Sequence, residues 1–321
     1  MIKNFKKTIL ASFVLPVFFS GIFAGFSPCK EKKPSEVTLE LWGVFDDSES
    51  WREVIANFSQ KYPYIKINYH KKNIVVYEKE LIDALAAGRG PDIFMINNTW
   101  LPKHQDKIAP APETLITSKR YNDIFVDVAS SDFVINDKIY AWPLGVDTLA
   151  LFYNKDLFNS AGLAEPPKTW EEFNKAAEKL TKRDKEGNII QAGAALGTAR
   201  NINRSTDILA ALMIQSGSKM VDNDKSSVVF NQSIGLSSGE RINPGERALL
   251  YYCSFADPQK RVYSWNDSQH YSLDSFVEGR VAMMFNYAYQ IFQLRARAPH
   301  LNFAVAEFPQ ISENSKKITL A

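Results

Sequence analysis

The sequence predicts an α/β protein with room for two domains. Its 321 residues exceed one small domain, and 45% hydrophobic with 23% charged residues is typical of a globular chain. Between residues 37 and 96, segments with strand and helix periodicity alternate in the order β-α-β-α-β. Such alternation builds a parallel sheet with right-handed crossovers, so we expect sheets flanked by helices.

The first half of the chain supplies these alternating elements. Residues 37–41 and 65–69 alternate apolar and polar side chains, which predicts two strands, and the short apolar run at 92–96 predicts a third. A capping box that opens at Ser50 predicts the helix between the first two strands. Apolar residues around Leu81 predict the helix before the third strand.

The second half repeats this mixture of elements. Residues 149–153 predict a strand, and a capping box that opens at Thr169 predicts the helix that follows. Further strands are expected at 281–285 and 302–308, with helices between them. Residues 318–321 begin another strand pattern that no closing element follows, so we expect a chain that is truncated at its C-terminus.

The N-terminus has the composition of an export signal. Residues 1–28 carry three lysines and then the uncharged run 8–26. The same run is long enough for a membrane-spanning helix, so an uncleaved anchor is the alternative, as is simple secretion. Cys29 follows directly, and 29–36 suits a polar tether behind a lipid-modified cysteine, although Pro28 is unusual there. We expect an exported protein, lipid-anchored through Cys29 at the outer face of the cytoplasmic membrane or in the periplasm.

Charge and cysteine content exclude several classes of protein. Lys plus Arg number 38 and Asp plus Glu 36; without the leader lysines Lys3, Lys6 and Lys7 the balance is 35 against 36. A near-neutral chain lacks the basic face that a nucleic-acid binder needs, so no nucleic-acid partner is expected. Two cysteines, Cys29 and Cys253, and four histidines without ligand spacing predict no metal site and no cofactor.

Four segments together resemble the family 1 extracellular solute-binding proteins of ABC importers, the group that includes maltose-binding protein. In chain order they are residues 87–94, 140–147, 151–170 and 276–284. The most specific residues are Tyr153, Asn154 and Lys155, together with Pro166, Pro167, Lys168, Thr169 and Trp170.

The resemblance implies a two-lobe, periplasmic-binding-protein-like fold of type II, in which a hinge joins two lobes that are each a sheet flanked by helices. Lobe 1 would be 37–145, with 304–321 returning to it, and lobe 2 would be 146–303. The ligand would be trapped in the cleft between the lobes, and hinge closure would deliver it to the permease in the membrane. Family members continue beyond the last residue of this chain, so part of the cleft would be missing.

Residues suited to binding a sugar stand where such a cleft is expected. Ligands bind outside the carboxyl ends of parallel strands, which points to the loops at 42–47 and 97–101. A sugar needs flat apolar surfaces for its C–H faces and fixed polar groups for its hydroxyls. The candidate ligand-binding residues are Trp42, Asp46, Asp47, Asn97, Asn98 and Trp100 in lobe 1, Asp147 at the crossing, and Trp265, Asn266, Asp267, Asn286 and Tyr287 in lobe 2.

Each candidate also has a purely structural interpretation. Trp42 could end a buried strand as a core residue, Asp46 or Asp47 could cap the next helix, and Asp147 could serve the hinge alone. Our hypothesis is a monomeric, non-catalytic binding subunit that delivers a sugar or oligosaccharide, or another small polar solute, to an ABC permease. The alternatives are an exported carbohydrate-active enzyme that pairs Asp46 or Asp47 with Asp267, and a ligand-sensing receptor subunit.

Overall fold

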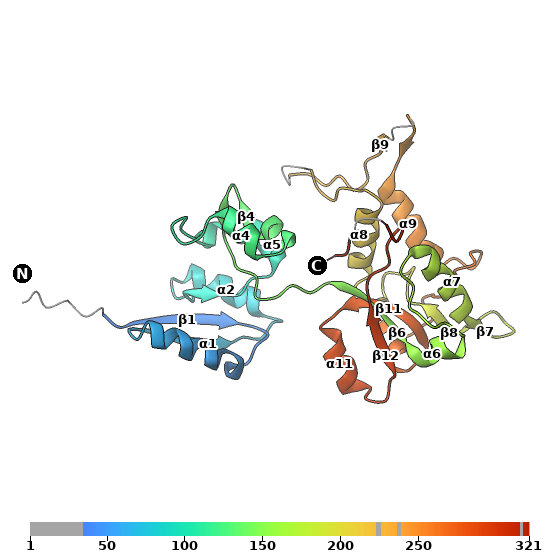
Figure 1. Cartoon of the computed structure of the whole chain (residues 1–321), viewed down its shortest axis with the longest axis horizontal. Helices are drawn as coiled ribbons and strands as arrows, with labels where there is room; N and C mark the ends of the chain where they lie inside the picture. Colours follow the sequence, from blue (N-terminus) through green and yellow to red (C-terminus); the bar gives the residue numbers. More distant parts are fainter. Residues whose placement is uncertain (1–34, 223–225, 236–238, 315–316, 321) are drawn as a thin grey trace, which may run out of the picture. The chain divides into compact units, whose positions relative to one another are not determined.

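A computed structural model (Figure 1) describes residues 35–222, 226–235, 239–314 and 317–320. The contacts divide the chain into two compact units: unit 1 runs up to Ala109, and unit 2 starts at Pro110. Each unit is described by itself. The predicted signal peptide and Cys29 lie outside the described residues. Within the described part of the chain, none of the helices is long and apolar enough to span a membrane.

Unit 1 is a parallel sheet with crossover helices. Its elements are β1 (Val37–Gly43), α1 (Ser48–Lys61), β2 (Ile65–Lys71), α2 (Tyr77–Ala86), β3 (Ile93–Phe94), η1 (Asn98–Trp100), α3 (Leu101–His104) and η2 (Gln105–Lys107). The strands lie parallel in the order β2-β1-β3, which confirms the predicted β-α-β-α-β succession. The capping box predicted at Ser50 is wrong, because α1 begins at Ser48 with Asp47 in the N-cap position.

A small core holds the helices of unit 1 on its sheet. Leu41 of β1, Tyr77 and Leu81 of α2, and Leu101 of α3 are buried. Trp51 of α1 stacks on Tyr69 of β2, with ring centroids 5.5 Å apart. Aromatic pairs at this separation add to the apolar burial, so these contacts fix α1 and α2 against the strands.

Unit 2 begins with a small segment that has its own core. Its elements are α4 (Ser118–Ile124), α5 (Asp127–Phe133), β4 (Val134–Ile135) and β5 (Lys138–Ile139). Tyr121, Ala129 and Ile139 are buried together in that core. Asn136 and Asp137 form the hairpin turn between β4 and β5 with φ of 50° and 60°, which these two residue types adopt more readily than most. Sequence analysis assigned this stretch to lobe 1, whereas the contacts group it with unit 2.

The rest of unit 2 is built on a five-stranded mixed sheet (Figure 1). Its elements are β6 (Leu149–Asn154), α6 (Lys155–Ser160), α7 (Trp170–Leu180), β7 (Lys182–Arg183), β8 (Ile189–Ala194), α8 (Ser205–Gln215), β9 (Ile234–Gly235), β10 (Arg241–Ile242), α9 (Pro244–Ser254), α10 (Ser272–Val277), β11 (Val281–Tyr287), α11 (Gln290–Arg297) and β12 (Phe303–Ala306). The strand order is β12-β6-β11-β8-β7, with β8 and β11 parallel and the other neighbours antiparallel.

The most family-specific residues have structural roles in unit 2. Asn154 caps α6, where its side-chain oxygen accepts bonds from the amides of Asp156 and Leu157 at 3.0 and 3.1 Å. The capping box at Thr169 is confirmed, because Thr169 and Glu172 bond each other's amides at the start of α7. These side chains satisfy helix N–H groups that would otherwise lack partners, which explains their place in the motif.

The last described strand of the chain belongs to the sheet of unit 2. β12 pairs with β6, and further on the amide of Leu149 donates to the carbonyl of Leu320 at 2.9 Å. The sequence analysis expected 304–321 to return to lobe 1. In the described part of this stretch, backbone pairing with β6 keeps the chain on unit 2.

Candidate functional site

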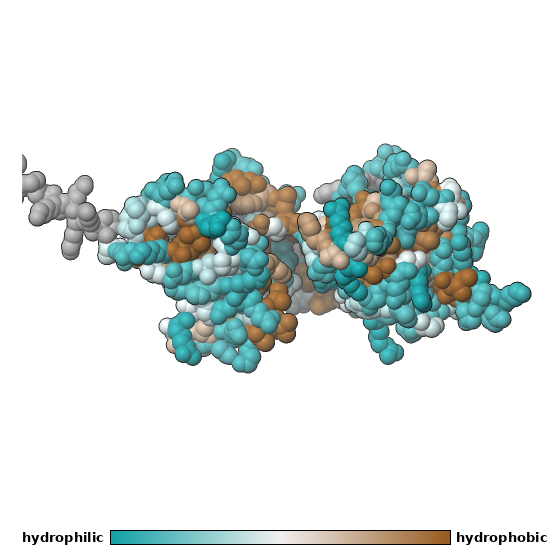
Figure 2. Space-filling model, turned by 90° about the horizontal axis from the view of Figure 1, so that it is seen from below, coloured by the Kyte–Doolittle hydropathy of each residue, from teal (hydrophilic) through white to brown (hydrophobic). Residues whose placement is uncertain are grey.

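The carboxyl edge of the unit-1 sheet gathers the first group of predicted site residues. The register places Trp42 of β1 opposite His70 of β2 and Phe94 of β3, so the three parallel strands end at one edge. The loops that leave this edge carry Asp46, Asp47, Asn97, Asn98 and Trp100. Apolar patches interrupt the mostly hydrophilic surface (Figure 2). Two exposed apolar residues, Phe45 and Val75, lie in the loops that follow β1 and β2 in the chain.

A lysine covers the indole ring of Trp42. Trp42 is half-buried, and the Nζ atom of Lys72 lies 3.6 Å from its ring centroid, in cation–π geometry. The same Nζ lies 3.9 Å from Oε2 of Glu80. A ligand that stacks on this ring must displace Lys72 or use the other ring face. Sequence reasoning missed Lys72, which follows β2 and belongs to no motif.

The two predicted aspartates of unit 1 are held by the neighbouring strand β2. The Tyr69 hydroxyl donates to the backbone carbonyl of Asp46 at 2.5 Å. The Asp47 carboxylate pairs with Lys71, and this hydrogen bond raises the pKa of the Lys71 ammonium above its usual value. Asp47 therefore takes the N-cap place by its backbone while its side chain binds a lysine.

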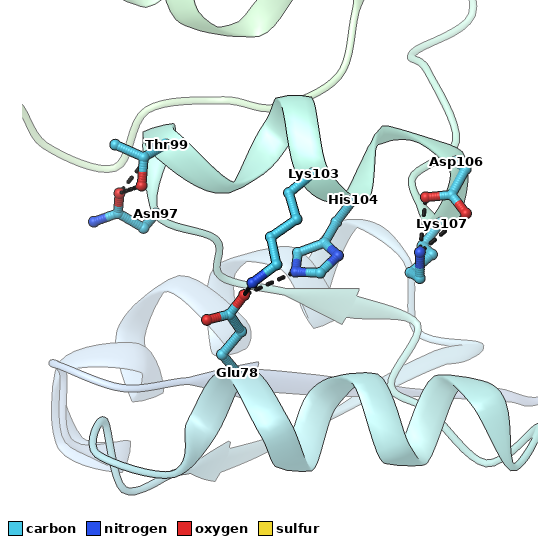
Figure 3. Close-up of polar contacts among 7 residues, drawn as sticks. All are labelled: Glu78, Asn97, Thr99, Lys103, His104, Asp106 and Lys107. Carbon is cyan, nitrogen blue, oxygen red and sulfur yellow. Dashed lines mark hydrogen bonds and ion pairs between the residues drawn. The ribbon is translucent and has the colours of Figure 1, made fainter.

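The loop after β3 is ordered by local hydrogen bonds and ring contacts. Asn97 Oδ1 accepts bonds from the amide and hydroxyl of Thr99 at 3.0 and 2.8 Å, which caps the short helix η1 (Figure 3). Trp100 is half-buried, with its ring 6.0 Å from Tyr77 and edge-on to His104 at 6.5 Å. These contacts fix the ring of Trp100 while leaving part of it exposed.

An ion-pair cluster supports that loop from α2. Oε1 of Glu78 lies 2.6 Å from Lys103 Nζ and 2.9 Å from His104 Nε2 (Figure 3). Hydrogen bonds from Lys103 and then His104 hold the pKa of the Glu78 carboxyl below its usual value. The cluster thus joins α2 to α3 beside Trp100.

The edge of the unit-2 sheet where β8 and β11 end carries the second group. Asp147 lies just before β6, which pairs with β11, so it stands at this edge. Its carboxylate accepts three backbone N–H bonds, from Thr148 and Ala288 at 2.8 Å and from Tyr289 at 2.9 Å. A carboxylate that is bonded three times anchors the turn between β11 and α11.

Arg204 reaches across this turn from the start of α8. Its Nη2 atom donates to the Tyr289 hydroxyl at 3.1 Å, and its guanidinium carbon lies 5.2 Å from the Tyr287 ring centroid. Its Nη1 lies 3.9 Å from Oδ2 of Asp207. Burial and then the carboxylate of Asp207 raise the pKa of Tyr287 to about 12. Sequence reasoning missed Arg204, Asp207 and Tyr289; the available signal was the position of residue 204 in the loop that follows β8.

Two buried amides complete the edge. Asn286 is fully buried; its Oδ1 accepts the Tyr287 amide at 2.9 Å, and its Nδ2 has no partner among the described residues. Gln290 is buried too, and its Nε2 donates to the Tyr289 hydroxyl at 2.9 Å. The buried Asn286 therefore stabilises the turn from the protein interior, while parts of Tyr287 and Tyr289 remain exposed.

The remaining predicted residues do not join this edge. Trp265 is fully buried in the core of unit 2, and its Nε1 donates to Asn201 at 3.1 Å, so its ring offers no face to a ligand in this structure. Asn266 lines a hollow with Ile189 and Arg280, at the amino ends of β8 and β11. Asp267, next in the chain, is exposed.

The side chains of the two edges suit an organic ligand. Within the described residues, no group of three or more His, Cys, Asp or Glu side chains could hold a metal ion. Both edges combine half-exposed aromatic rings with fixed hydrogen-bonding groups. That combination suits a ligand with C–H faces and hydroxyls.

Residues 42–315 match the family described as bacterial extracellular solute-binding protein. The chain belongs to this family. The match spans both units and confirms the resemblance that the sequence motifs carried. Family members are extracellular binding proteins, which agrees with the predicted export.

Known members and solved structures support this assignment. The chain is 27% identical over 264 residues to a binding protein of Brucella abortus, covering 81% of this chain and 59% of that protein. It is 27% identical over 230 residues to the arabinooligosaccharide-binding protein of Bacillus subtilis, covering 68% and 50%. A solute-binding protein of an ABC transporter from Thermotoga lettingae, bound with α-D-tagatose, superposes with a TM-score of 0.60 at 25% identity, covering 89% and 71%. The two-lobe α/β fold is thereby confirmed, and the chain spans less than two thirds of the first two proteins.

Proposed function

We propose that this chain is the substrate-binding component of an ABC importer that captures a sugar or oligosaccharide and delivers it to a membrane permease. The observation that carries the proposal is the pair of strand-end edges, one in each unit, that combine half-exposed aromatic rings with fixed polar groups. Each edge is proposed as a ligand-contacting surface of its own unit, and release would follow from a conformational state that binds the ligand less tightly.

The chemistry of the unit-2 edge supports a sugar as the cargo. Tyr287 and Tyr289 supply ring surface for C–H faces, and Arg204 and Asp207 supply polar groups beside them. Relatives with sugar-specific names support the same class, among them the arabinooligosaccharide-binding protein and a maltotriose-binding protein of Pyrococcus abyssi.

The remaining parts of the proposal concern location and partners. A lipid on Cys29 or an N-terminal anchor would tether a monomer to the outer face of the cytoplasmic membrane, next to the permease. No cofactor is needed, because capture and release leave the ligand unchanged. The relatives are binding proteins, which supports binding over catalysis.

The test is a binding titration that also follows the fate of the ligand. Full-length protein would be titrated by calorimetry with arabinotriose, maltotriose, galactobiose, mannobiose and tagatose, and each sugar would be recovered and analysed by chromatography. We expect saturable binding of at least one sugar and its recovery intact. Cleavage products would favour the enzyme alternative, and the absence of binding across the panel would contradict the proposal.

A variant pair assigns the binding to the proposed edge. Tyr289→Ala removes an aromatic ring of the unit-2 edge and is expected to weaken binding at least tenfold. Tyr64→Ala removes a tyrosine of similar exposure from the start of β2, at the opposite end from the loops of the unit-1 edge, and serves as the matched control.

A further inference from the structure

The hydroxyl of Tyr289 is bonded by two donors. Its oxygen lies 3.1 Å from Nη2 of Arg204 and 2.9 Å from Nε2 of Gln290. A guanidinium carries only donors, and an amide NH₂ group is also a donor. A phenolic hydroxyl that accepts two hydrogen bonds has its lone pairs occupied and keeps only its own proton to offer.

No described residue accepts that proton. Among the residues that the structure describes, the Tyr289 hydroxyl accepts two hydrogen bonds and donates none. Tyr289 is 41% exposed, whereas Gln290 beside it is buried. The O–H bond is therefore free to donate to a group that arrives from solvent.

The donor is held in place before any ligand binds. Asp147 accepts the backbone N–H of Tyr289 and that of Ala288, which fixes the backbone under the ring. Arg204 has a φ of 63°, a left-handed conformation that non-glycine residues rarely adopt, and from there it reaches the hydroxyl. A donor that is fixed in advance costs little ordering entropy when the ligand arrives.

The local charges favour an uncharged acceptor. The positive charge of Arg204 is opposed by Asp207 at 3.9 Å, and the carboxylate of Asp147 binds the backbone of the turn that carries Tyr289. An anionic ligand group would meet two carboxylates and one cation at this edge. A hydroxyl or ring oxygen of a sugar meets no such repulsion.

We infer that Tyr289 is a specificity-determining residue whose hydroxyl, which accepts hydrogen bonds from Arg204 and Gln290, donates a hydrogen bond to an uncharged acceptor oxygen of the ligand. The inference rests on the proposed sugar-binding function. It predicts that one defined oxygen of the sugar is recognised as an acceptor at the unit-2 edge.

The experiment compares Tyr289→Phe with the unchanged protein on the panel sugar that binds best, and on the monodeoxy analogues of that sugar. Tyr289→Phe keeps the ring and removes the donor, so we expect about tenfold weaker binding, as for one lost hydrogen bond. At one ligand position, removing the oxygen should weaken binding to the unchanged protein but not to the variant. Tyr64→Phe is the control and should bind every analogue like the unchanged protein.

A second variant tests the polarity of the network. Gln290→Glu replaces a donor by an acceptor that takes the Tyr289 proton, so it should reproduce the loss seen in Tyr289→Phe; thermal melting would confirm that the variant is folded. Equal affinities of Tyr289→Phe and the unchanged protein, or an equal loss for every analogue, would overturn the inference while leaving sugar binding intact. If the unchanged protein binds no sugar of the panel, the proposed function fails and the inference with it.

Discussion

The two strand-end edges of this protein are built in different ways. At the edge of unit 1, lysines meet an indole ring and a carboxylate, as in Lys72 over Trp42 and Lys71 with Asp47. At the edge of unit 2, a carboxylate binds three backbone amides, and two donors converge on the Tyr289 hydroxyl. Exposed ion pairs contribute little and rearrange easily, whereas several hydrogen bonds that converge on one group constrain its geometry. We therefore expect the edge of unit 2 to keep one geometry and the edge of unit 1 to be more adaptable.

The largest expected effect is on stability, and it distinguishes Trp265 from Trp42, both of which the sequence predicted as ligand-binding residues. Trp265→Ala empties a fully buried site, so the free energy of unfolding should fall by about 3–5 kcal/mol. Trp42→Ala removes a half-buried ring and should cost clearly less stability. Denaturant unfolding measures both. Similar losses for the two variants would contradict the assignment of Trp265 to the core.

The next effect compares aspartates at the two edges. Asp147→Ala leaves three backbone N–H groups without their carboxylate, which should lower the free energy of unfolding by about 2–4 kcal/mol and abolish ligand binding. Asp46→Ala keeps the backbone carbonyl that Tyr69 binds, so the free energy of unfolding should fall by only about 0.5 kcal/mol. Chemical denaturation and calorimetry would be run on both. An Asp147→Ala protein as stable as Asp46→Ala would remove the contrast between the edges.

A smaller effect separates stability from binding within unit 2. In Arg204→Gly, relief of the left-handed backbone offsets the lost side-chain contacts, so the free energy of unfolding should change by less than about 1 kcal/mol. The affinity should nevertheless fall about tenfold, because the donor to Tyr289 is gone. Arg200→Gly, in the same loop, is the control. Retained affinity in Arg204→Gly would show that the arginine serves only the fold.

The smallest effect concerns pH and unit 1. The pKa of Glu78 is lowered by Lys103 and His104, so its carboxylate stabilises the folded state above the usual value of 4.5, and this stability is lost as the pH falls through the folded-state pKa. The advantage of the unchanged protein over Glu78→Gln should be present at neutral pH and shrink in acid. Urea unfolding at several pH values measures it. A difference that is constant with pH would mean that the charge of Glu78 contributes nothing.

The fold was largely predictable, because its signals are local. The strands around residues 39 and 67 follow from alternation over a few residues, and the cap at Thr169 follows from a four-residue pattern. The start of α1 was misplaced, because Ser50 and Glu53 have capping-box spacing without capping geometry. The edge of unit 1 was predicted for the same local reason, since a parallel β-α-β succession brings successive strand ends together.

By itself, the sequence determined the β-α-β-α-β succession of unit 1, the family and part of the composition of the proposed ligand-binding edges. The tertiary structure decided which of those side chains stay available. It buried Trp265 and placed Asn266 at the opposite end of β8 from Tyr287. It also brought the carboxylate of Asp147 to the backbone N–H of Tyr289, 142 residues away in the chain, and the guanidinium of Arg204 to the Tyr289 hydroxyl. Such contacts depend on how distant segments pack, and short-range periodicity carries no record of that packing.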